Sequence, residues 1–399
     1  MSIRLVELKL ECFRSHQNFS INGLGSCLII VGSNATGKTN LIEAIQLLSN
    51  CESFRSSKWQ EMIKREATQA FLHGHYEGDD RKFDISLNIE ANSYSYCFNG
   101  KKKQRRDLVQ LSPAVLFTPD DLVLVKGPAE QRRSMIDSLG KRISKQYSMI
   151  VQDYQKILKQ RNRILKDLQK SSASNKKSMT GEDAWSVSLA SLGAQLLIQR
   201  YRLFQRLLTE AAVQYRKLSE REELSYDYFA SFQDAPLTDM DVSNRELLQQ
   251  QLLENMQRRR SEEIARGLSL VGPHRDEIVF LLAGQDARNF ASQGQQRSIA
   301  LAIKLAEVEL IRLNTGNMPL LLLDDVLSEL DESRRNNLAD LCQQACQSVI
   351  TATELQLIPK RLYQQGKVIQ LTGNMLQSEQ LEIRSNSEVR QRSATQPGA

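Results

Sequence analysis

The segment with the most specific chemistry lies near the amino terminus and follows the pattern G-x-x-x-x-G-K-[ST]. Its residues are Gly32, Ser33, Asn34, Ala35, Thr36, Gly37, Lys38 and Thr39. The glycines allow the backbone N–H groups to face a phosphate, and the helix expected to begin near Lys38 adds the positive end of its dipole. Lys38 is expected to reach the β- and γ-phosphates, and the Thr39 hydroxyl to bind Mg²⁺. The segment therefore predicts a site for ATP and Mg²⁺.

Two adjacent carboxylates, Asp324 and Asp325, follow the apolar run Leu320–Leu323. Such a run is typical of a strand buried on both faces, and α/β sheets bind ligands at the carboxyl ends of parallel strands. Asp324 is expected to hold Mg²⁺ through water, and Asp325 to orient or deprotonate the attacking water. An apolar strand that ends in acids is common, so this assignment depends on the phosphate-binding segment.

A third segment, Asn289–Arg297, has the sequence of a helix start. Ser292 and Gln295 have the S-x-x-Q spacing of a capping box, and Gly294 allows a close approach. An apolar helix is predicted to continue over Ile299–Ile311. The N-terminus of a helix attracts anions. Taken alone, however, the segment favours an ordinary capped helix.

Strands predicted around these segments indicate a mixed α/β structure at both ends of the chain. Short apolar runs indicate buried strands, and alternating runs indicate strands with one buried face. A helix is expected over Leu41–Leu48, and Asn99-Gly100 is typical of a two-residue hairpin turn. The predicted strands are Ile3–Leu10, Cys27–Val31, Lys82–Ile89, Ala114–Phe117, Ile278–Leu282, Leu320–Leu323, Val349–Thr351 and Val368–Leu371.

The middle of the chain has helical periodicity instead. From Ile143 to Leu168, apolar residues recur in steps of four and three, and Arg161 interrupts the series once. The polar stretch Lys170–Asp183 separates this run from a second periodic run over Leu197–Tyr215. Two long helices around a polar tip predict an antiparallel helical hairpin.

A third helix of this region is expected to begin at Ser243, which has capping-box spacing to Glu246, and to run towards Arg266. The simplest architecture is an α/β head that is split in the sequence by this helical lobe. The expected domains are the N-terminal half of the head (1–125), the helical lobe (126–266), the C-terminal half of the head (267–373) and a polar, disordered tail (374–399).

The composition excludes several classes of protein. The chain has 399 residues, 41% of them hydrophobic and 25% charged, which is ordinary for a globular protein with a core. No apolar run approaches the roughly 18–20 residues that span a bilayer, and the first ten residues do not resemble a signal peptide. The six cysteines include no CxxC pair. These features predict a cytoplasmic protein with reduced thiols and no membrane partner.

Positive charge is concentrated in one part of the chain. The net charge is +6, whereas Lys126–Lys170 alone has twelve basic and four acidic residues. A face of basic residues binds phosphates, although a single basic run is more often solvated surface. Few aromatic residues for base stacking lie near these runs in the sequence. The candidate DNA contacts are Lys101, Lys102, Lys103, Arg105, Arg106, Arg132, Arg133, Lys141, Arg142, Lys145 and Arg258–Arg260.

Together, these segments resemble the nucleotide-binding set of ABC-type ATPases. The set comprises a Walker A loop, a signature loop, a Walker B strand and, here, Ser328-Glu329-Leu330-Asp331 in the place of a D-loop. In that class two heads enclose ATP, and the signature loop of each head completes the site of the other. In this chain 260 positions and a helical hairpin separate Gly32 from Ser292. That spacing is similar to the SMC branch, but the arms are far too short for an SMC protein.

Further motifs resemble the RecF family of bacterial DNA replication and repair proteins over roughly residues 1–373. By position, the resemblance implies that Arg14 lies near the nucleotide, and that Lys38, Asp325 and Ser292 are the catalytic residues. It also implies contacts to the γ-phosphate across the dimer from Ser292, Gln293 and Gly294. The motifs that carry the resemblance are Phe13–His16, Asn34–Asn40, Phe117–Leu122, Val125–Gly127, Arg132-Arg133, Val271–Asp276, Ser292–Arg297 and Leu323–Asp331.

The family binds single-stranded and gapped DNA, acts with RecR and RecO, and helps RecA to load at stalled replication sites. The resemblance therefore implies an ATP-dependent homodimer that binds single-stranded and gapped duplex DNA in replication, recombinational repair and the SOS response. Its ATPase is expected to be weak and stimulated by DNA, so that ATP acts chiefly as a switch.

Two departures from the wider ABC pattern are consistent with slow turnover. Thr351-Ala352-Thr353 occupies the switch position where transporters often have histidine, and Asp325 replaces the usual glutamate. Aspartate is one methylene shorter, so it holds the attacking water less well. No glutamine is assigned as the Q-loop residue, and Phe117–Leu122 is its expected equivalent.

Three other functions stay open on the sequence. The main alternative is an SMC-like structural DNA clamp or tether, against which the short hairpin and its polar tip argue. A transporter-type ATPase subunit would need a coupling surface for a membrane partner and a shorter gap between the Walker A and signature loops. A small-molecule kinase would leave the signature-like helix start and the D-loop-like segment unexplained.

Overall fold

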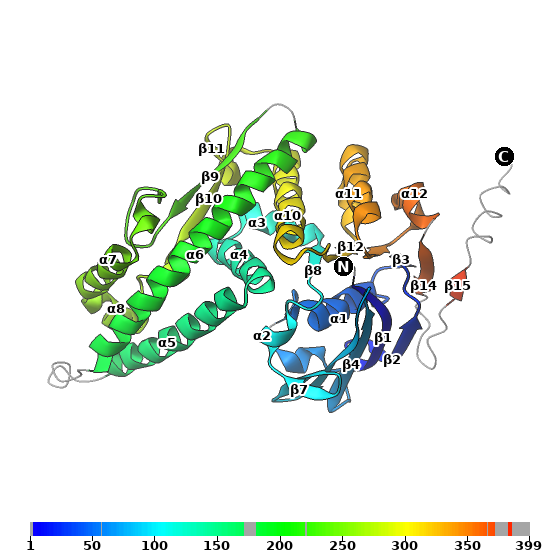
Figure 1. Ribbon diagram of the computed structural model, residues 1–399, viewed down its shortest axis with the longest axis horizontal. Helices are drawn as coiled ribbons and strands as arrows, with labels where there is room; N and C mark the ends of the chain where they lie inside the picture. The colour runs from blue at the N-terminus through cyan, green and yellow to red at the C-terminus, as the bar shows by residue number, and fades with distance from the viewer. Residues whose placement is uncertain are drawn as a thin grey trace. The chain divides into compact units, whose positions relative to one another are not determined.

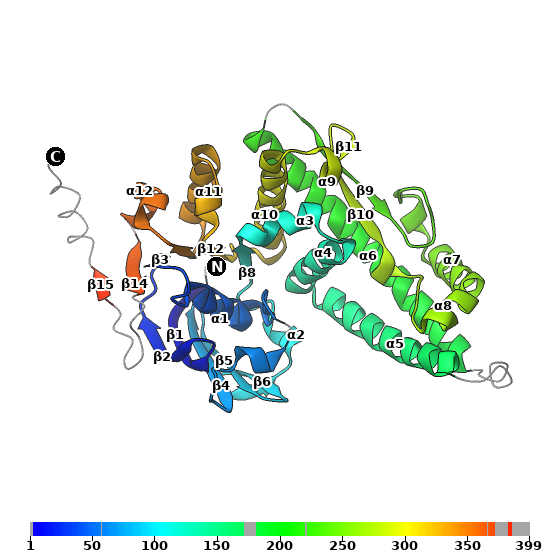
Figure 2. The same cartoon turned by 180° about the vertical axis from the view of Figure 1, so that it is seen from behind.

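The computed structural model describes residues 3–56, 58–170, 181–219, 222–364, 366–371 and 382–384. The chain forms two compact units, and Figures 1 and 2 show the elements of each. Unit 1 consists of Met1–Asp120 and Ile311–Ala399, and unit 2 of Asp121–Leu310. Most of the predicted polar hairpin tip, residues 171–180, lies outside the described residues.

A largely parallel sheet of unit 1 contains the predicted buried strands. Its order is β15-β14-β3-β13-β12-β8, and every pair is parallel except β14 with β15. All residues of β8, β12 and β13 are buried, as expected for strands covered on both faces. Five strand predictions are confirmed: β3 (Cys27–Gly32), β8 (Ala114–Phe117), β12 (Leu320–Asp324), β13 (Ser348–Ala352) and β14 (Lys367–Leu371).

One segment of the predicted disordered tail is described. Glu382–Arg384 forms β15, which pairs antiparallel with β14 and places Ile383 opposite Ile369. These three residues are therefore not part of an unstructured tail. The other residues of 374–399 lie outside the described residues.

The second sheet of unit 1 is antiparallel, in the order β2-β1-β4-β5-β6-β7. Asn99 and Gly100 join β6 to β7 with φ angles of 47° and 75°. Two positive φ angles are what a type I′ hairpin turn needs, so the predicted turn is confirmed. The strands are β1 (Arg4–Phe13), β2 (His16–Asn22), β4 (Gln69–Glu77), β5 (Lys82–Glu90), β6 (Tyr94–Phe98) and β7 (Lys101–Lys103).

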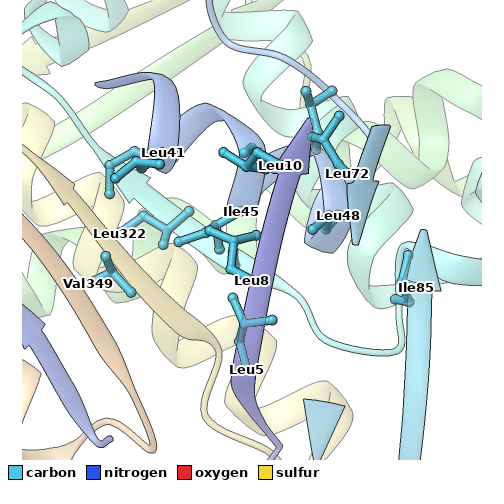
Figure 3. Packing of buried hydrophobic residues seen from close by; sticks show 14 of the residues in the cluster. Leu5, Leu8, Leu10, Leu41, Ile45, Leu48, Leu72, Ile85, Leu322 and Val349 are labelled. Carbon is cyan, nitrogen blue, oxygen red and sulfur yellow. The ribbon is translucent and has the colours of Figure 1, made fainter. Parts of the chain in front are cut away.

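Helix α1 (Lys38–Asn50) packs against both sheets and forms the centre of the core of unit 1. Its buried Ile45 lies near Leu8 of the antiparallel sheet and Leu322 of the parallel sheet (Figure 3). Burial of each such side chain contributes about 1.5–3 kcal/mol relative to exposure. This packing fixes the N-terminus of α1 at the carboxyl edge of the parallel sheet.

Unit 2 contains the predicted helical hairpin, formed by α5 (Lys145–Lys170) and α6 (Gly181–Leu218), which pack along each other. Arg161, which interrupts the heptad pattern, is buried. It donates to Glu263 Oε2 at 2.6 Å and to the hydroxyls of Ser186 and Ser269. A buried arginine is tolerated because its charge is paired and its donors are used.

The third predicted helix begins one residue later than expected. Asn244, not Ser243, is the N-cap of α7 (Arg245–Arg258), and its side chain accepts a hydrogen bond from the Leu247 N–H. The Ser243 hydroxyl instead donates to the carbonyl of Met240 in the preceding 3₁₀ turn. The helix also breaks at residue 259, after which α8 (Arg260–Arg266) begins.

A third, antiparallel sheet lies in unit 2, in the order β11-β10-β9. The predicted strand at Ile278–Leu282 is present as part of β10 (Glu277–Leu282). It pairs with β9 (Leu224–Phe229) and β11 (Gln285–Asp286), not with a strand of the head. For this reason residues 267–310, expected in the C-terminal half of the head, cluster with the helical unit. Among the helices that are described, none has the length and apolar composition needed to cross a membrane.

Candidate nucleotide-binding site

The predicted phosphate loop connects the carboxyl end of β3 to α1, as the motif requires. Ala35 and Gly37 have φ angles of 67° and 98°. A Cβ atom at Gly37 would lie 2.8 Å from His16 Nε2 and 2.9 Å from Ser15 Oγ. Both its conformation and these contacts restrict this position to glycine, and the loop leaves the first N–H groups of α1 to face a ligand.

Lys38 extends back across the loop. Its Nζ donates to the carbonyl oxygens of Gly32 at 2.8 Å and Ser33 at 3.2 Å, and it lies 3.6 Å from Asp325 Oδ2. Only 3% of the residue is exposed. A buried ammonium held at the mouth of a glycine-rich loop suits a phosphate ligand.

The start of α1 and the carboxyl ends of β12 and β13 bring the expected metal ligands Thr39 and Asp324 together with Thr351. Thr39 Oγ1 donates to Asp324 Oδ1 at 3.1 Å, and Thr351 Oγ1 donates to the same oxygen at 2.8 Å. Burial raises the pKa of Asp324, and the two hydroxyl hydrogen bonds oppose this shift. Thr39 and Asp324 are 285 positions apart in the sequence, yet their side chains are in direct contact.

Asp325 faces Lys38 through only one of its two carboxylate oxygens. Its backbone is left-handed, with φ of 50°, and its N–H donates to Thr351 Oγ1 at 2.9 Å. Oδ2 faces Lys38, whereas Oδ1 is buried and has no hydrogen-bond partner within the described part of the chain. A buried carboxylate oxygen without a partner is costly unless a ligand or a water fills the position. This arrangement fits an acceptor for the attacking water.

The turn between β1 and β2 contacts one face of α1 at three positions. His16 Nε2 lies 3.2 Å from Gly37 O, and Asn40 Nδ2 donates to Ser15 Oγ at 2.8 Å. Arg14 then pairs with Glu43. Because residues 37, 40 and 43 lie on one helix face, this turn connects the antiparallel sheet directly to the phosphate loop.

Glu43 is a residue of this site that the sequence reasoning missed. It is fully buried and accepts from Arg14 Nε at 2.9 Å, from Arg14 Nη2 at 2.7 Å and from Ser53 Oγ at 2.6 Å. Arg55 Nη1 lies 3.7 Å from the same carboxylate and donates to Asn40 Oδ1 at 2.6 Å. One feature of the sequence could have identified Glu43, because it is a charged residue within the largely apolar helix segment Leu41–Leu48.

Replacement of Glu43 with alanine is expected to lower the free energy of unfolding by about 3 kcal/mol, because it leaves the largely buried Arg14 guanidinium without its carboxylate. Urea denaturation measures the loss. A matched control is Glu332→Ala on the exposed start of α11 (Glu332–Gln344), which should cost less than about 1 kcal/mol. Equal losses in the two variants would show that the Arg14–Glu43 pair adds nothing to stability.

The signature-like segment lies in unit 2, where the predicted capping box is confirmed. The Ser292 N–H donates to Gln295 Oε1 at 2.6 Å, and the Gln295 N–H donates to Ser292 Oγ at 3.3 Å. Helix α10 (Gln293–Thr315) begins here. Ser292 and Gln293 are exposed and Gly294 is half-buried, so the helix start is open to a ligand.

Two further predicted segments, Ser328–Asp331 and the start of Phe117–Leu122, lie near the Walker B strand. In the D-loop-like segment, Ser328 Oγ donates to Asp325 O at 2.7 Å, and the Asp331 side chain caps α11. Phe117, at the end of β8, lies opposite Leu323 of β12. The segment expected to replace the Q-loop therefore begins beside the Walker B carboxylates.

Comparison with known proteins agrees with the resemblance to the RecF family. The model of the RecF/RecN/SMC N terminal domain matches residues 4–372. A Synechococcus protein named DNA replication and repair protein RecF is 36% identical over 375 residues, which cover 93% of this chain and 97% of that protein. One of the same name from Enterococcus faecalis is 35% identical over 377 residues, covering 92% of this chain and 98% of that protein.

Solved structures agree on the fold. A structure described as the recombination mediator protein RecF-ATP in the RecFOR pathway has a TM-score of 0.85 and 27% identity, with coverage of 96% of this chain and 98% of that one. An Smc head domain from Pyrococcus furiosus with an extended coiled coil has a TM-score of 0.52 and 16% identity, covering 98% and 99% of the two chains. The chain therefore belongs to the RecF family of DNA replication and repair proteins, and its fold is the ABC-type ATPase head with a helical insertion.

Proposed function

We propose that this protein is an ATP-controlled DNA-binding factor in replication and recombinational repair. The observation that carries the proposal is the cluster of Lys38, Thr39, Asp324 and Asp325 at the carboxyl edge of the parallel sheet. ATP would supply the phosphate charge that Lys38 neutralises, and Mg²⁺ the positive charge that suits Thr39 and Asp324. Related proteins are named for DNA replication and repair, and one related structure is described as bound to ATP.

Each residue of the cluster has a separate role in the proposal. The loop Gly32–Thr39 binds the phosphates, and Lys38 neutralises their charge. Thr39 and Asp324 hold Mg²⁺, and Asp325 Oδ1 accepts a proton from the attacking water. Arg14, held by Glu43, lies beside the nucleotide. Because Asp325 is shorter than glutamate, turnover is slow and the bound state persists.

ATP binding is proposed to drive the formation of a homodimer. The exposed start of α10 would then bind the γ-phosphate held by the other copy, through Ser292, Gln293 and Gly294. Exposure of this helix start supports the proposal, because a site completed by another copy must be accessible in the monomer.

The proposed DNA-binding surface differs from the set of candidates taken from the sequence. Arg132 and Arg142 are buried and form ion pairs with Glu277 and Glu307, so their charges stabilise the fold. A basic face of α5 fits phosphates better. It consists of four exposed residues in steps of three and four, Lys156, Lys159, Arg163 and Lys166.

Partners and location follow from the family. RecR and RecO are the proposed protein partners, RecA the protein whose loading is assisted, and the SOS response one outcome of the pathway. One related structure is described as a recombination mediator of the RecFOR pathway, which supports the proposal. The cytoplasm is the proposed location, because the six cysteines are free and a reducing compartment keeps them so.

The experiment that tests the proposal measures binding to a gapped duplex with and without ATP and Mg²⁺, together with molar mass by light scattering. We expect tight, salt-sensitive binding and a change from monomer to dimer only with ATP. DNA binding that is indifferent to ATP, or ATP-driven dimers that ignore DNA, would contradict the coupling.

A further inference from the structure

The edge of the antiparallel sheet in unit 1 carries a run of positive charge. Lys101, Lys102 and Lys103 make up β7, which pairs with β6 on one side and ends the sheet on the other. All three residues are exposed. Lysines on a sheet edge also prevent edge-to-edge aggregation, so the charge alone does not identify a ligand.

An aromatic pair beside this edge supplies the second observation. The rings of Trp59 and Tyr94 are stacked, with centroids 4.0 Å apart and an interplanar angle of 24°. Trp59 packs against the core of unit 1, and Tyr94 is 38% exposed. The Tyr94 ring therefore stacks on an indole that packs against the core, and more than a third of the residue stays exposed to solvent. The sequence alone does not predict this stacked pair, because Trp59 lies far along the chain from Lys101–Lys103.

The aromatic pair adjoins the basic edge, and Lys101 and Lys103 share the face of Tyr94, whereas Lys102 lies on the other face of the sheet. Tyr96 lies opposite Lys103 in the β6–β7 register, so Tyr94 is two residues beyond the last pair. The chain continues from Lys103 to Arg105, whose guanidinium interacts electrostatically with Tyr96 and Tyr94 and lies 3.9 Å from Glu52. Lys58 immediately precedes Trp59, is exposed and lies 3.6 Å from Glu61. Basic residues thus lie next to both members of the aromatic pair, Lys58 beside Trp59 in the sequence and Arg105 beside Tyr94.

We propose that this surface, the β7 edge with Tyr94 and Trp59, binds the single-stranded segment of gapped DNA. One unpaired base stacks on the exposed part of Tyr94, and the phosphates on either side lie along the lysines of β7 and at Lys58. The inference rests on the proposed DNA-binding function and adds a preference for unpaired bases. In a duplex each base is already stacked on its neighbours, so an aromatic side chain selects single strands without reading sequence.

The test compares Tyr94→Ala with Tyr94→Phe on three probes: an oligothymidylate, a gapped duplex and a blunt duplex, each with ATP and Mg²⁺. Loss of the ring is expected to weaken binding to the oligothymidylate about tenfold, with a similar effect on the gapped duplex. Binding to the blunt duplex should be unchanged. Tyr94→Phe retains the ring and should bind all three probes as the native protein does. Unaltered ATP binding in each variant shows that the head remains folded.

A second pair of variants tests the charges. Replacement of Lys101, Lys102 and Lys103 with glutamine should reduce the slope of log affinity against log salt by about 2 on oligothymidylate, since each phosphate contact adds about 0.7. The matched control removes three charges that are not among the candidate DNA contacts, with Arg216, Arg266 and Arg361 changed to glutamine. Their side chains pair with Glu223, Glu262 and Asp340, so the slope should not change.

The outcomes separate this inference from the proposed function. If Tyr94→Ala weakens blunt-duplex binding as much as single-strand binding, or weakens neither, the stacking surface is wrong although ATP-controlled DNA binding stands. Equal slope changes in the two triple variants would contradict the path along β7. If the native protein binds none of the three probes, the proposed function fails, and this inference fails with it.

Discussion

Lys38→Ala is expected to abolish ATP binding, and Lys38→Arg to retain binding but lose hydrolysis. In the structure, Lys38 Nζ donates to two loop carbonyls and faces Asp325, so it lies where phosphate charge must be neutralised. Alanine removes that charge, and loss of roughly 3 kcal/mol of charge-assisted binding corresponds to about a hundredfold in Kd. Arginine keeps the charge but presents a longer, planar group that does not fit the same position.

Fluorescence titration with a labelled ATP analogue measures binding, and phosphate release in the presence of DNA measures hydrolysis. A suitable control is Lys64→Ala, a half-buried lysine outside the loop whose removal should alter neither quantity. If Lys38→Ala binds ATP with native affinity, the phosphate loop has been assigned to the wrong segment. If Lys38→Arg hydrolyses ATP at the native rate, the ammonium has no special role in the chemical step.

Local sequence patterns predicted the strands and the long helices because these patterns depend only on residues that are close together in the sequence. The leucines of β12 and the turn Asn99-Gly100 depend on neighbouring residues alone. Helix starts were less exact, since Ser243 and Asn244 are both good caps and only the tertiary structure selects one. The strand Ile278–Leu282 was also found, but its partner β9 was not, so its sheet was misplaced.

The chemical groups of the site were predictable where a motif fixes their spacing. Lys38 and Thr39 follow from the loop pattern, and Asp324 and Asp325 from the end of a buried strand. The contact between Thr39 and Asp324 was expected from their shared role, and the structure contains it. Their roles in binding and hydrolysis stay predictions.

Contacts between distant segments could not be predicted in the same way. Glu43 and Arg55 are in contact because a loop folds back over α1. No periodic pattern in the sequence predicts this contact. Arg161 looked like a defect in a heptad, although Glu263 compensates its charge from another helix. Trp59 and Tyr94 likewise stack across two segments. In each case the stabilising partner lies far along the chain, and one sequence does not identify it.

Ser292→Arg is expected to leave ATP binding to the monomer intact and to block ATP-driven dimers. Ser292 is exposed at the start of α10, and the phosphate loop lies in unit 1, so the substitution does not alter the loop itself. The arginine side chain would fill the space in which another copy must place its γ-phosphate. Ser292→Ala is the matched control, because it loses the same capping hydroxyl, worth about 1 kcal/mol, without adding bulk. Light scattering with ATP should show dimers for Ser292→Ala and monomers for Ser292→Arg.

Mixing the two defective proteins distinguishes a signature loop that acts on the other copy from one that acts on its own. In a mixed dimer of Lys38→Ala and Ser292→Arg subunits, one composite site contains both defects. The other contains the intact loop of the Ser292→Arg subunit and the intact signature of the Lys38→Ala subunit. DNA-stimulated hydrolysis by the mixture should therefore exceed the sum of the two proteins measured alone. If Ser292 acts within its own chain, neither subunit has an intact site, and the mixture stays inactive. Dimers of Ser292→Arg alone would contradict the cross-dimer role directly.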